Sequence, residues 1–408
     1  MKGNVIVGQS GGPTAVINSS LAGVFKTAKD RGAAVVYGMQ HGIQGILNDQ
    51  IVDLSDHIRN NLDIELLKRT PSSYLGSCRY KLPTVKEDKE VYEKIFAKLE
   101  ELDIKYFFYI GGNDSMDTIY KLSEYAKEID SPIRFVGVPK TIDNDLAVTD
   151  HTPGYGSAAK YIASITKEVI RDGLVYDIKS VTILEIMGRN AGWLTGAAAL
   201  ARGEDCEGPD MILLPEITFD PKAFVERVSQ IQEKKKSVVI AVSEGIRLDN
   251  GKYVCEMESA LGNMDAFGHS ILSGTGRVLA SMISGELGCK ARAIEFSTLQ
   301  RCASHIVSRV DITEAYQVGA AAVTAAHDGE TGKMIILDRV SEEPYQCNTG
   351  TYDISKIANL EKSVPLEWID IENYFVTNKF LNYCRPLIQA ELTPVMVEGL
   401  PRHLYYEE

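Results

Sequence analysis

The sequence predicts an α/β protein in which parallel sheets are flanked by helices, and two observations lead to this prediction. Short apolar runs of strand length alternate with segments of helix length along most of the chain, as is typical of parallel sheets with crossover helices. The chain has 408 residues, which is enough for about two domains at roughly 100–200 residues each.

A series of apolar runs forms the predicted strands, and polar loops follow the first three. The runs lie at residues 4–7, 106–110, 134–138, 181–186, 211–214, 238–242 and 291–296. Glycine-rich or acidic loops follow at residues 8–13, 111–115 and 139–145. Ligands of such sheets bind at the carboxyl ends of the strands, so we expect these loops to border one site.

The composition of the chain changes along its length. A proline and a glycine at residues 153–154 precede a long predicted helix, and beyond about residue 332 the pattern becomes polar and aromatic. We therefore expect an N-terminal domain over residues 1–145, a second domain over 146–331 and a C-terminal extension over 332–408 that packs on the core. The alternative is that some late segments return to the first domain.

Charge and cysteine content disfavour several classes of function. The chain carries 43 basic and 56 acidic side chains, for a net charge of −13, and an acidic surface repels the backbone of nucleic acids. The seven cysteines include no CxxC pair and are typical of reduced, cytoplasmic thiols. The most apolar stretch, residues 191–201, falls short of the roughly 20 residues that span a bilayer. We expect a cytoplasmic protein without nucleic-acid or membrane partners.

Two glycine pairs, Gly11-Gly12 and Gly111-Gly112, follow predicted strands. Glycine lets backbone N–H groups approach an anion at the start of a helix, although a tight turn without a ligand gives the same pattern. The chain has no GxxxxGK[ST] loop and no GxGxxG after a predicted strand. This argues against P-loop NTPases and standard dinucleotide enzymes.

A serine hydrolase is one alternative. Residues 8–12 match the GxSxG spelling of a nucleophile elbow, with Ser10 at its centre. An elbow on the first strand of the chain is unusual, and no histidine stands out as the partner base. We therefore regard the hydrolase as the distant alternative.

Two further loops carry charged residues that suit phosphate chemistry. Asp143 and Asp145 flank Asn144 at the end of a predicted strand, where one carboxylate can act as a base and the other near a metal. The same residues are also common in turns. Arg189 follows another strand and can either bind a phosphate or form a structural ion pair. The residues alone leave these alternatives open.

Taken together, the motifs resemble those of the 6-phosphofructokinase family, in order and spacing over about the first 310 residues. They are Gly11-Gly12, Gly111-Gly112-Asn113-Asp114-Ser115, Pro139-Lys140-Thr141-Ile142-Asp143-Asn144-Asp145, Met187-Gly188-Arg189, Ser243-Glu244-Gly245 and Gln300-Arg301. The resemblance implies two doubly wound, mostly parallel α/β domains with the active site in the cleft between them. It also implies Mg²⁺-dependent phosphoryl transfer to the 1-hydroxyl of fructose 6-phosphate by a homodimer or homotetramer.

The resemblance also assigns roles by motif position. Asp143 matches the general base of the family, Asp145 its electrostatic or metal-linked neighbour, and Thr141 the contact with the transferring phosphoryl group. The first domain would bind the donor through Gly11, Gly12, Arg79, Gly112, Asn113, Asp114, Ser115 and Lys140. The second would bind the sugar phosphate, together with Thr141, through Met187, Gly188, Arg189, Glu244, Arg292 and Arg301. In some members of the family a neighbouring subunit supplies part of the grip on the 6-phosphate.

Two positions indicate the phosphoryl donor. ATP-dependent relatives typically carry glycine where Asp114 and Lys140 stand, whereas pyrophosphate-dependent relatives carry this aspartate and lysine. Asp114 would crowd and repel the α-phosphate of ATP, and Lys140 offers a point charge to the compact pyrophosphate. The sequence therefore predicts a reversible glycolytic enzyme that forms fructose 1,6-bisphosphate and phosphate. An ATP-dependent enzyme is the nearest alternative.

The chain departs from the family pattern at several positions. Asn113 replaces an aspartate, which keeps a carbonyl acceptor but removes a charge and weakens the case for Mg²⁺ ligation there. Asp145 is the other candidate ligand. Thr298 replaces a histidine, and Lys179 stands near a missing arginine. A noncatalytic sugar-phosphate-binding regulator is a third alternative, which the presence of Asp143 disfavours.

Overall fold

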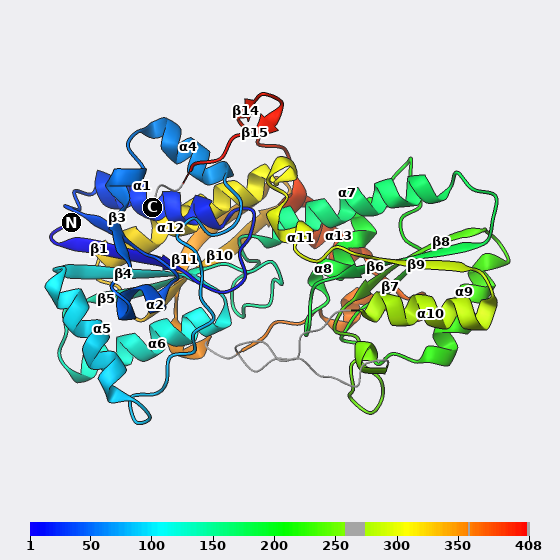
Figure 1. Ribbon diagram of the computed structural model, residues 1–408, viewed down its shortest axis with the longest axis horizontal. Helices are drawn as coiled ribbons and strands as arrows, with labels where there is room; N and C mark the ends of the chain where they lie inside the picture. The colour runs from blue at the N-terminus through cyan, green and yellow to red at the C-terminus, as the bar shows by residue number, and fades with distance from the viewer. Residues whose placement is uncertain (258–273, 358–359, 406–408) are drawn as a thin grey trace.

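The computed structural model describes residues 1–257, 274–357 and 360–405. A seven-stranded sheet and a four-stranded sheet, each with helices packed on its faces, lie side by side (Figure 1). Most strands in the larger sheet and all strands in the smaller one run parallel. The predicted α/β class with two mostly parallel sheets is confirmed.

The larger sheet has the strand order β11-β10-β5-β4-β1-β2-β3, with antiparallel pairing only at its two edges among the described residues. The chain leaves β1 toward β2 on one side and later returns to β4 on the other. The strand order therefore switches direction between β1 and β4, where ligands bind in sheets of this kind. The strands span Asn4–Gln9 (β1), Val36–Met39 (β2), Ile51–Asp53 (β3), Ile104–Gly111 (β4), Arg134–Pro139 (β5), Lys333–Glu342 (β10) and Tyr345–Asp353 (β11).

The smaller sheet has the strand order β7-β8-β6-β9. Its strands span Ser180–Ile186 (β6), Met211–Leu213 (β7), Ser237–Ser243 (β8) and Lys290–Glu295 (β9). Two short antiparallel pairs lie near the C-terminus, Ile369–Asp370 (β12) with Phe375–Val376 (β13) and Met396–Val397 (β14) with Leu400–Pro401 (β15).

Helices connect the strands and cover both sheets (Figure 1). The longer ones are Ile17–Asp30 (α1), Asn61–Arg69 (α4), Lys89–Glu101 (α5), Asn113–Glu128 (α6), Tyr155–Gly173 (α7), Pro221–Gln232 (α9), Thr275–Leu287 (α10) and Arg309–His327 (α12). The shorter ones are Ile43–Leu47 (α2), Leu54–His57 (α3), Trp193–Gly196 (α8), Leu299–Cys302 (α11) and Asn378–Cys384 (α13). Short 3-10 turns span Ala197–Ala201, Val254–Met257, Ser304–Ile306, Ile354–Lys356, Leu366–Trp368 and Arg385–Ile388. Within the described ranges, no helix has both the length and the apolar character needed to cross a membrane.

Both faces of the larger sheet are covered, which explains the uninterrupted apolar character of its central strands. Side chains alternate between the faces along a strand. In β1, Val5 and Val7 therefore share a core with α1 and α12. Ile6 points to the opposite face and packs in a core with α5 and α6.

The chain returns to the larger sheet after it has completed the smaller one. α12 packs against α1, and β10 pairs in parallel with β5 through Lys333 opposite Val136 and Met334 opposite Gly137. Residues 333–353 are therefore two strands of the larger sheet. The domain limits at residues 145 and 331 stay predictions.

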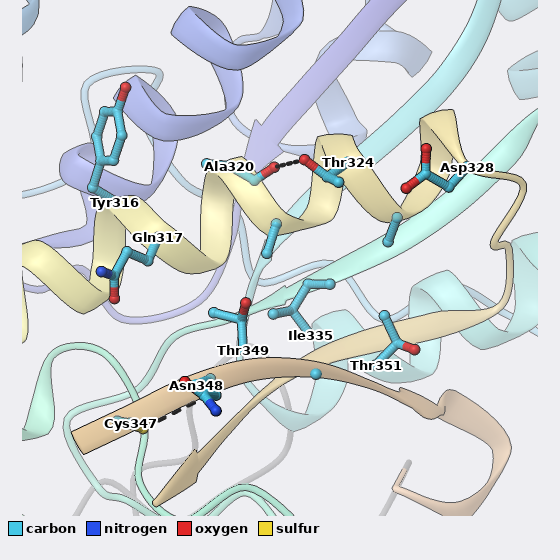
Figure 2. A pocket seen from close by; sticks show the side chains of 13 residues that line it. Tyr316, Gln317, Ala320, Thr324, Asp328, Ile335, Cys347, Asn348, Thr349 and Thr351 are labelled. Atoms are coloured by element: carbon cyan, nitrogen blue, oxygen red, sulfur yellow. Dashed lines mark hydrogen bonds between the residues drawn. The ribbon is translucent and has the colours of Figure 1, made fainter. Parts of the chain in front are cut away.

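Two glycines allow α1 and α12 to approach each other closely. A methyl group on Gly319 of α12 would lie 2.1 Å from the backbone oxygen of Ser20, and one on Gly23 of α1 would lie 2.1 Å from that of Tyr316. Farther along α12, a groove of about 540 Å³ separates small side chains such as Ala320 and Thr324 from β11 (Figure 2).

We predict that Gly319→Ala lowers the free energy of unfolding by about 1–3 kcal/mol, because the added methyl group forces the two helix backbones apart. Gly285→Ala is the matched control, since Gly285 lies in α10 with no atom within 4 Å of the added methyl group. That change should be neutral or stabilise by up to about 1 kcal/mol through helix propensity. Urea unfolding measures both values, and equal effects would refute the close-contact explanation.

Candidate active site

A cavity of about 850 Å³ lies between loops from the carboxyl ends of both sheets. The loops after β1, β4 and β5 contribute residues 10–13, 112–115 and 140–143 together with Asp145. The smaller sheet contributes Met187, Arg189, Asn190, Ala191, Glu244 and Arg301. The edge of the sheets at which the sequence places its polar loops is therefore the edge at which the cavity opens.

Nearly all of the predicted site residues meet at this cavity. Those that line it are Gly11, Gly12, Arg79, Gly112, Asn113, Asp114, Ser115, Lys140, Thr141, Asp143, Asp145, Met187, Arg189, Glu244 and Arg301. Gly188 and Arg292 do not line it. Gly188 accepts a hydrogen bond from Ser243 Oγ at 2.6 Å. Arg292 lies on β9, where its Nε donates to Thr182 Oγ1 at 3.1 Å and its Nη2 pairs with Asp172 at 3.4 Å.

Three charged or amide side chains in the cavity were not among the predicted residues. Lys81 and Asn190 lie close in sequence to the predicted residues Arg79 and Arg189. Their proximity to these arginines is a signal from which they could have been predicted. Glu361 reaches the cavity from the C-terminal segment, because its backbone forms a bridge with Leu146. No local pattern in the sequence predicts this long-range pairing.

One part of the cavity, for which the sequence predicts donor binding, is formed by glycine loops that lie against Lys140 and the start of α6. Gly11 has a φ of 75°, and the Lys140 ammonium donates a 2.7 Å hydrogen bond to the Gly12 oxygen. At Gly111 a methyl group would lie only 1.8 Å from Ser115 Oγ. The first turn of α6 lines the cavity, so its N-terminal N–H groups favour an anion there.

Lys140 is almost completely buried, with 2% of its surface exposed. Burial lowers the pKa of its ammonium to about 8, although the charges of Asp143 and Asp145 oppose this shift. A bound anion would stabilise the ammonium and raise its pKa again. Lys140 is therefore suited to a ligand that brings negative charge.

The carboxylates that line the cavity, among them Asp143 and Asp145, repel one another. Burial, together with the charges of Asp143 and Glu361, raises the pKa of Asp145 to about 7. Burial also raises the pKa of Asp143, against the effect of Lys140. The pKa of Glu244 rises to about 8 through burial and the charge of Asp143. Arg189 and Arg301 oppose this rise at Asp143, and Arg189 also opposes it at Glu244.

The oxygens near Asp145 suit a hard divalent cation. Asn113 Nδ2 lies 3.5 Å from Asp145 Oδ2, at the limit of a hydrogen bond. Asn113 Oδ1 is buried and has no hydrogen-bond partner among the described residues. Carboxylate and amide oxygens are the ligands that Mg²⁺ accepts in proteins. Asn113 and Asp145 stay the predicted ligands of such an ion; in this arrangement the amide nitrogen of Asn113, not its oxygen, is turned toward Asp145.

Arginines join the two halves of the cavity. Arg301 comes from the smaller sheet, and its Nη1 would lie 3.3 Å from a methyl group on Gly12 in the larger one. Arg189 Nε is buried without a hydrogen-bond partner in the described part of the chain. Such a buried donor carries a free-energy cost unless a ligand satisfies it.

Ser10 also lies in the cavity wall, and its side chain forms a hydrogen bond with Tyr109. None of the described histidines lines the cavity. The described residues therefore show no Ser-His pair of the kind that a serine hydrolase uses, and His269 lies outside them.

Comparison with known proteins decides the family. The sequence model described as Phosphofructokinase matches residues 4–326. The chain belongs to the phosphofructokinase family. It is 40% identical over 403 residues to a pyrophosphate--fructose 6-phosphate 1-phosphotransferase of Halomonas elongata, covering 98% of this chain and 95% of that protein. A relative of the same name from Methylococcus capsulatus is 39% identical over 406 residues, which cover 98% of this chain and 95% of that protein.

A solved structure agrees with this assignment. The pyrophosphate-dependent phosphofructokinase of Nitrosospira multiformis superposes with a TM-score of 0.88 at 38% sequence identity, covering 98% of this chain and 95% of that one. The phosphofructokinase fold with two sheets is therefore shared along nearly the whole length of both chains.

We predict that anion binding weakens as the pH rises above 8, because Lys140 must then take up a proton when the anion binds. Below pH 8 the free protein already carries this proton, so Lys140 itself adds little pH dependence there. Above it, the dissociation constant for sulfate should rise by up to about tenfold per pH unit. Calorimetry at pH 7 and pH 9 measures the change, and Lys140→Met should reduce it to the part that the ionisation of Asp145 and Glu244 causes. Equal sulfate affinities of the unmodified protein at both pH values would contradict this assignment.

Proposed function

We propose that this phosphofructokinase transfers a phosphoryl group from pyrophosphate to the 1-hydroxyl of fructose 6-phosphate. The observation that carries the proposal is the pair of charged residues in the donor half, Asp114 in the first turn of α6 and the buried Lys140 beneath the glycine loops. Side chains there take space that a nucleotide needs, and Lys140 supplies a positive charge to a small anion. The names of the relatives from H. elongata and M. capsulatus support the same donor.

In this mechanism Asp143 accepts the proton of the 1-hydroxyl while the hydroxyl oxygen attacks the nearer phosphorus of pyrophosphate. The new O–P bond forms as the bridging P–O bond breaks, and inorganic phosphate leaves. Thr141 and the cavity arginines stabilise charge on the transferring oxygens, which is the main requirement of phosphoryl transfer. Lys140 neutralises the departing phosphate. Because pyrophosphate is the donor, we expect the reaction to run readily in both directions.

The family implies a magnesium ion, and the residues present fit one. Asn113 Oδ1 and Asp145 would hold it, with Asp143 close by. When bound, the ion neutralises charge on the donor phosphates. The neutral Asn113 contributes an oxygen without adding to the repulsion between the two aspartates.

The sugar phosphate would lie in the other half of the cavity. Arg189 and Arg301 would bind its phosphate bidentately, and Glu244 would accept hydrogen bonds from its hydroxyls while Met187 packs against the ring. Arg292 lies outside the cavity, so it would act only on the site of a neighbouring subunit in a homodimer or homotetramer. Six cysteines are free thiols, which supports the cytoplasmic location that we propose; they are Cys78, Cys206, Cys289, Cys302, Cys347 and Cys384.

We predict that Asp143→Ala lowers kcat by at least about 10²-fold, because the 1-hydroxyl loses its base. Asp338→Ala removes an exposed carboxylate on β10 and is the matched control, with kcat unchanged. Steady-state rates with pyrophosphate and fructose 6-phosphate, together with the melting temperatures, measure both effects. Nearly normal turnover in a folded Asp143→Ala protein would remove this residue from the mechanism.

The donor is tested by initial rates with fructose 6-phosphate, Mg²⁺ and either pyrophosphate or ATP. We predict faster turnover with pyrophosphate. Asp114→Gly combined with Lys140→Gly should raise kcat/KM for ATP, since it removes both the crowding and the repulsion at the α-phosphate. Faster turnover of the unmodified protein with ATP would overturn the donor assignment. No gain for ATP in a folded double variant would refute the steric explanation alone.

A further inference from the structure

The loop that carries the two aspartates is held through the residue between them. Asn144 is fully buried and has a φ of 55°, a conformation that asparagine tolerates better than most residues. Its Nδ2 donates to Tyr383 Oη at 2.8 Å, and its Oδ1 accepts from the Thr152 backbone at 3.1 Å. The side chain of Asn144 therefore fixes the backbone on which Asp143 and Asp145 stand.

The partner of Asn144 comes from the C-terminal segment of the chain. Tyr383 lies on α13, and its hydroxyl also donates to the backbone oxygen of Asp150 at 2.7 Å. Burial holds the pKa of Tyr383 well above its usual value, so the hydroxyl keeps the proton that it donates. This single hydroxyl thus connects the aspartate turn to residue 150 farther along the same loop.

The phenol ring is itself held rigidly. Its centroid lies 5.2 Å from that of Trp193 and 5.4 Å from that of Trp368. The Arg339 guanidinium stands 4.7 Å from the ring centroid and donates to the Tyr383 backbone oxygen at 3.1 Å. Arg339 also binds Asp150 Oδ1 at 2.9 Å. Displacement of the hydroxyl would therefore require several packed side chains to move together.

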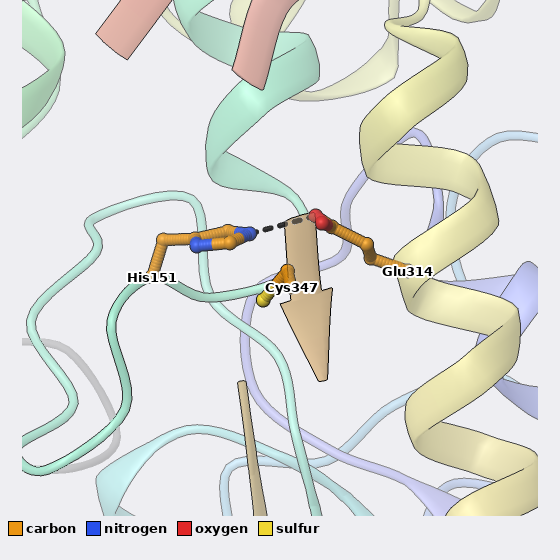
Figure 3. Close-up of side chains that lie close together, drawn as sticks. All are labelled: His151, Glu314 and Cys347. Atoms are coloured by element: carbon orange, nitrogen blue, oxygen red, sulfur yellow. Dashed lines mark hydrogen bonds and ion pairs between the residues drawn. The ribbon is translucent and has the colours of Figure 1, made fainter. Parts of the chain in front are cut away.

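An ion-pair cluster anchors the far end of the loop. His151 lies against Asp150 and Glu314 with both ring nitrogens, at 2.8 Å and 2.7 Å, and Cys347 is close by (Figure 3). Both nitrogens can donate only in the imidazolium form, and these carboxylates raise the pKa of His151 to about 9 despite its burial. Burial and Glu314 raise the pKa of Cys347 to about 12. A metal ion bound here would have to displace one imidazolium proton of His151 and the thiol proton of Cys347. The cluster therefore fits an ionic anchor and not a metal site.

We propose that Tyr383 is a positioning residue of this enzyme, which holds Asp143 in its reacting orientation through Asn144 without contacting the substrates. The inference rests on the proposed function, because its main readout is turnover. It assigns a role in the reaction to the C-terminal segment, in which Glu361 is the only described residue that lines the cavity.

Tyr383→Phe tests this proposal because it deletes one oxygen atom and keeps the ring. We expect kcat to fall about tenfold, since a small misplacement of a reacting group is costly, while KM for both substrates changes less than twofold. The matched control is Tyr92→Phe. Tyr92 is a buried tyrosine whose hydroxyl donates to the Pro83 oxygen at 2.6 Å, on α5 and outside the cavity. It should lose comparable thermal stability with kcat unchanged.

A double variant separates positioning from general loosening of the fold. Asn144→Gly tolerates the positive φ but removes both side-chain hydrogen bonds, so adding Tyr383→Phe to it should lower kcat no further. Amide hydrogen exchange at residues 143–146 should be faster in Tyr383→Phe than in Tyr92→Phe. Equal kcat in Tyr383→Phe and the unmodified protein, or additive losses in the double variant, would overturn the inference. Absence of pyrophosphate-dependent turnover in the unmodified protein would instead reject the proposed function, and the exchange measurement would still test the contact.

Discussion

Repulsion between partly buried carboxylates is the constraint on which the site depends. Asp143, Asp145 and Glu361 gather at one end of the cavity, where burial removes much of the water that would screen their charges. Other parts of the chain must therefore hold these groups in place. Lys140 lies close enough to Asp143 and Asp145 for their charges to oppose the effect of burial on its ammonium. A ligand that joins phosphate anions to a divalent cation brings partners for both the ammonium and the carboxylates.

The two sheets contribute different charged groups to the cavity. The larger sheet supplies the glycine loops, the ammonium and the aspartates, because its switch in strand order brings three loop ends together. The smaller sheet supplies Arg189, Glu244 and Arg301. Arg301 reaches across to Gly12, so the shape of the cavity depends on how the two sheets are placed relative to each other.

Local patterns predicted most of the site, and long-range pairing accounts for what they missed. Gly11, Gly111 and Asp143 lie at the ends of apolar strands, so periodicity and turn chemistry place them at one edge of the fold. The family motif places Arg292 on a strand but does not predict the direction in which its side chain points. In the structure this side chain pairs with Asp172 and does not line the cavity. Glu361 reaches the site through a backbone bridge that no short motif encodes. The same reason explains why β10 and β11 could not be assigned to the larger sheet from the sequence.

The order of synthesis gives the C-terminal contacts a further meaning. A nascent chain that has passed residue 353 already contains every strand of the seven-stranded sheet. Lys362, whose backbone donates to the Asp145 oxygen, and Tyr383 are then still to come. The segment that secures the aspartate turn is therefore the last of these parts to be synthesised.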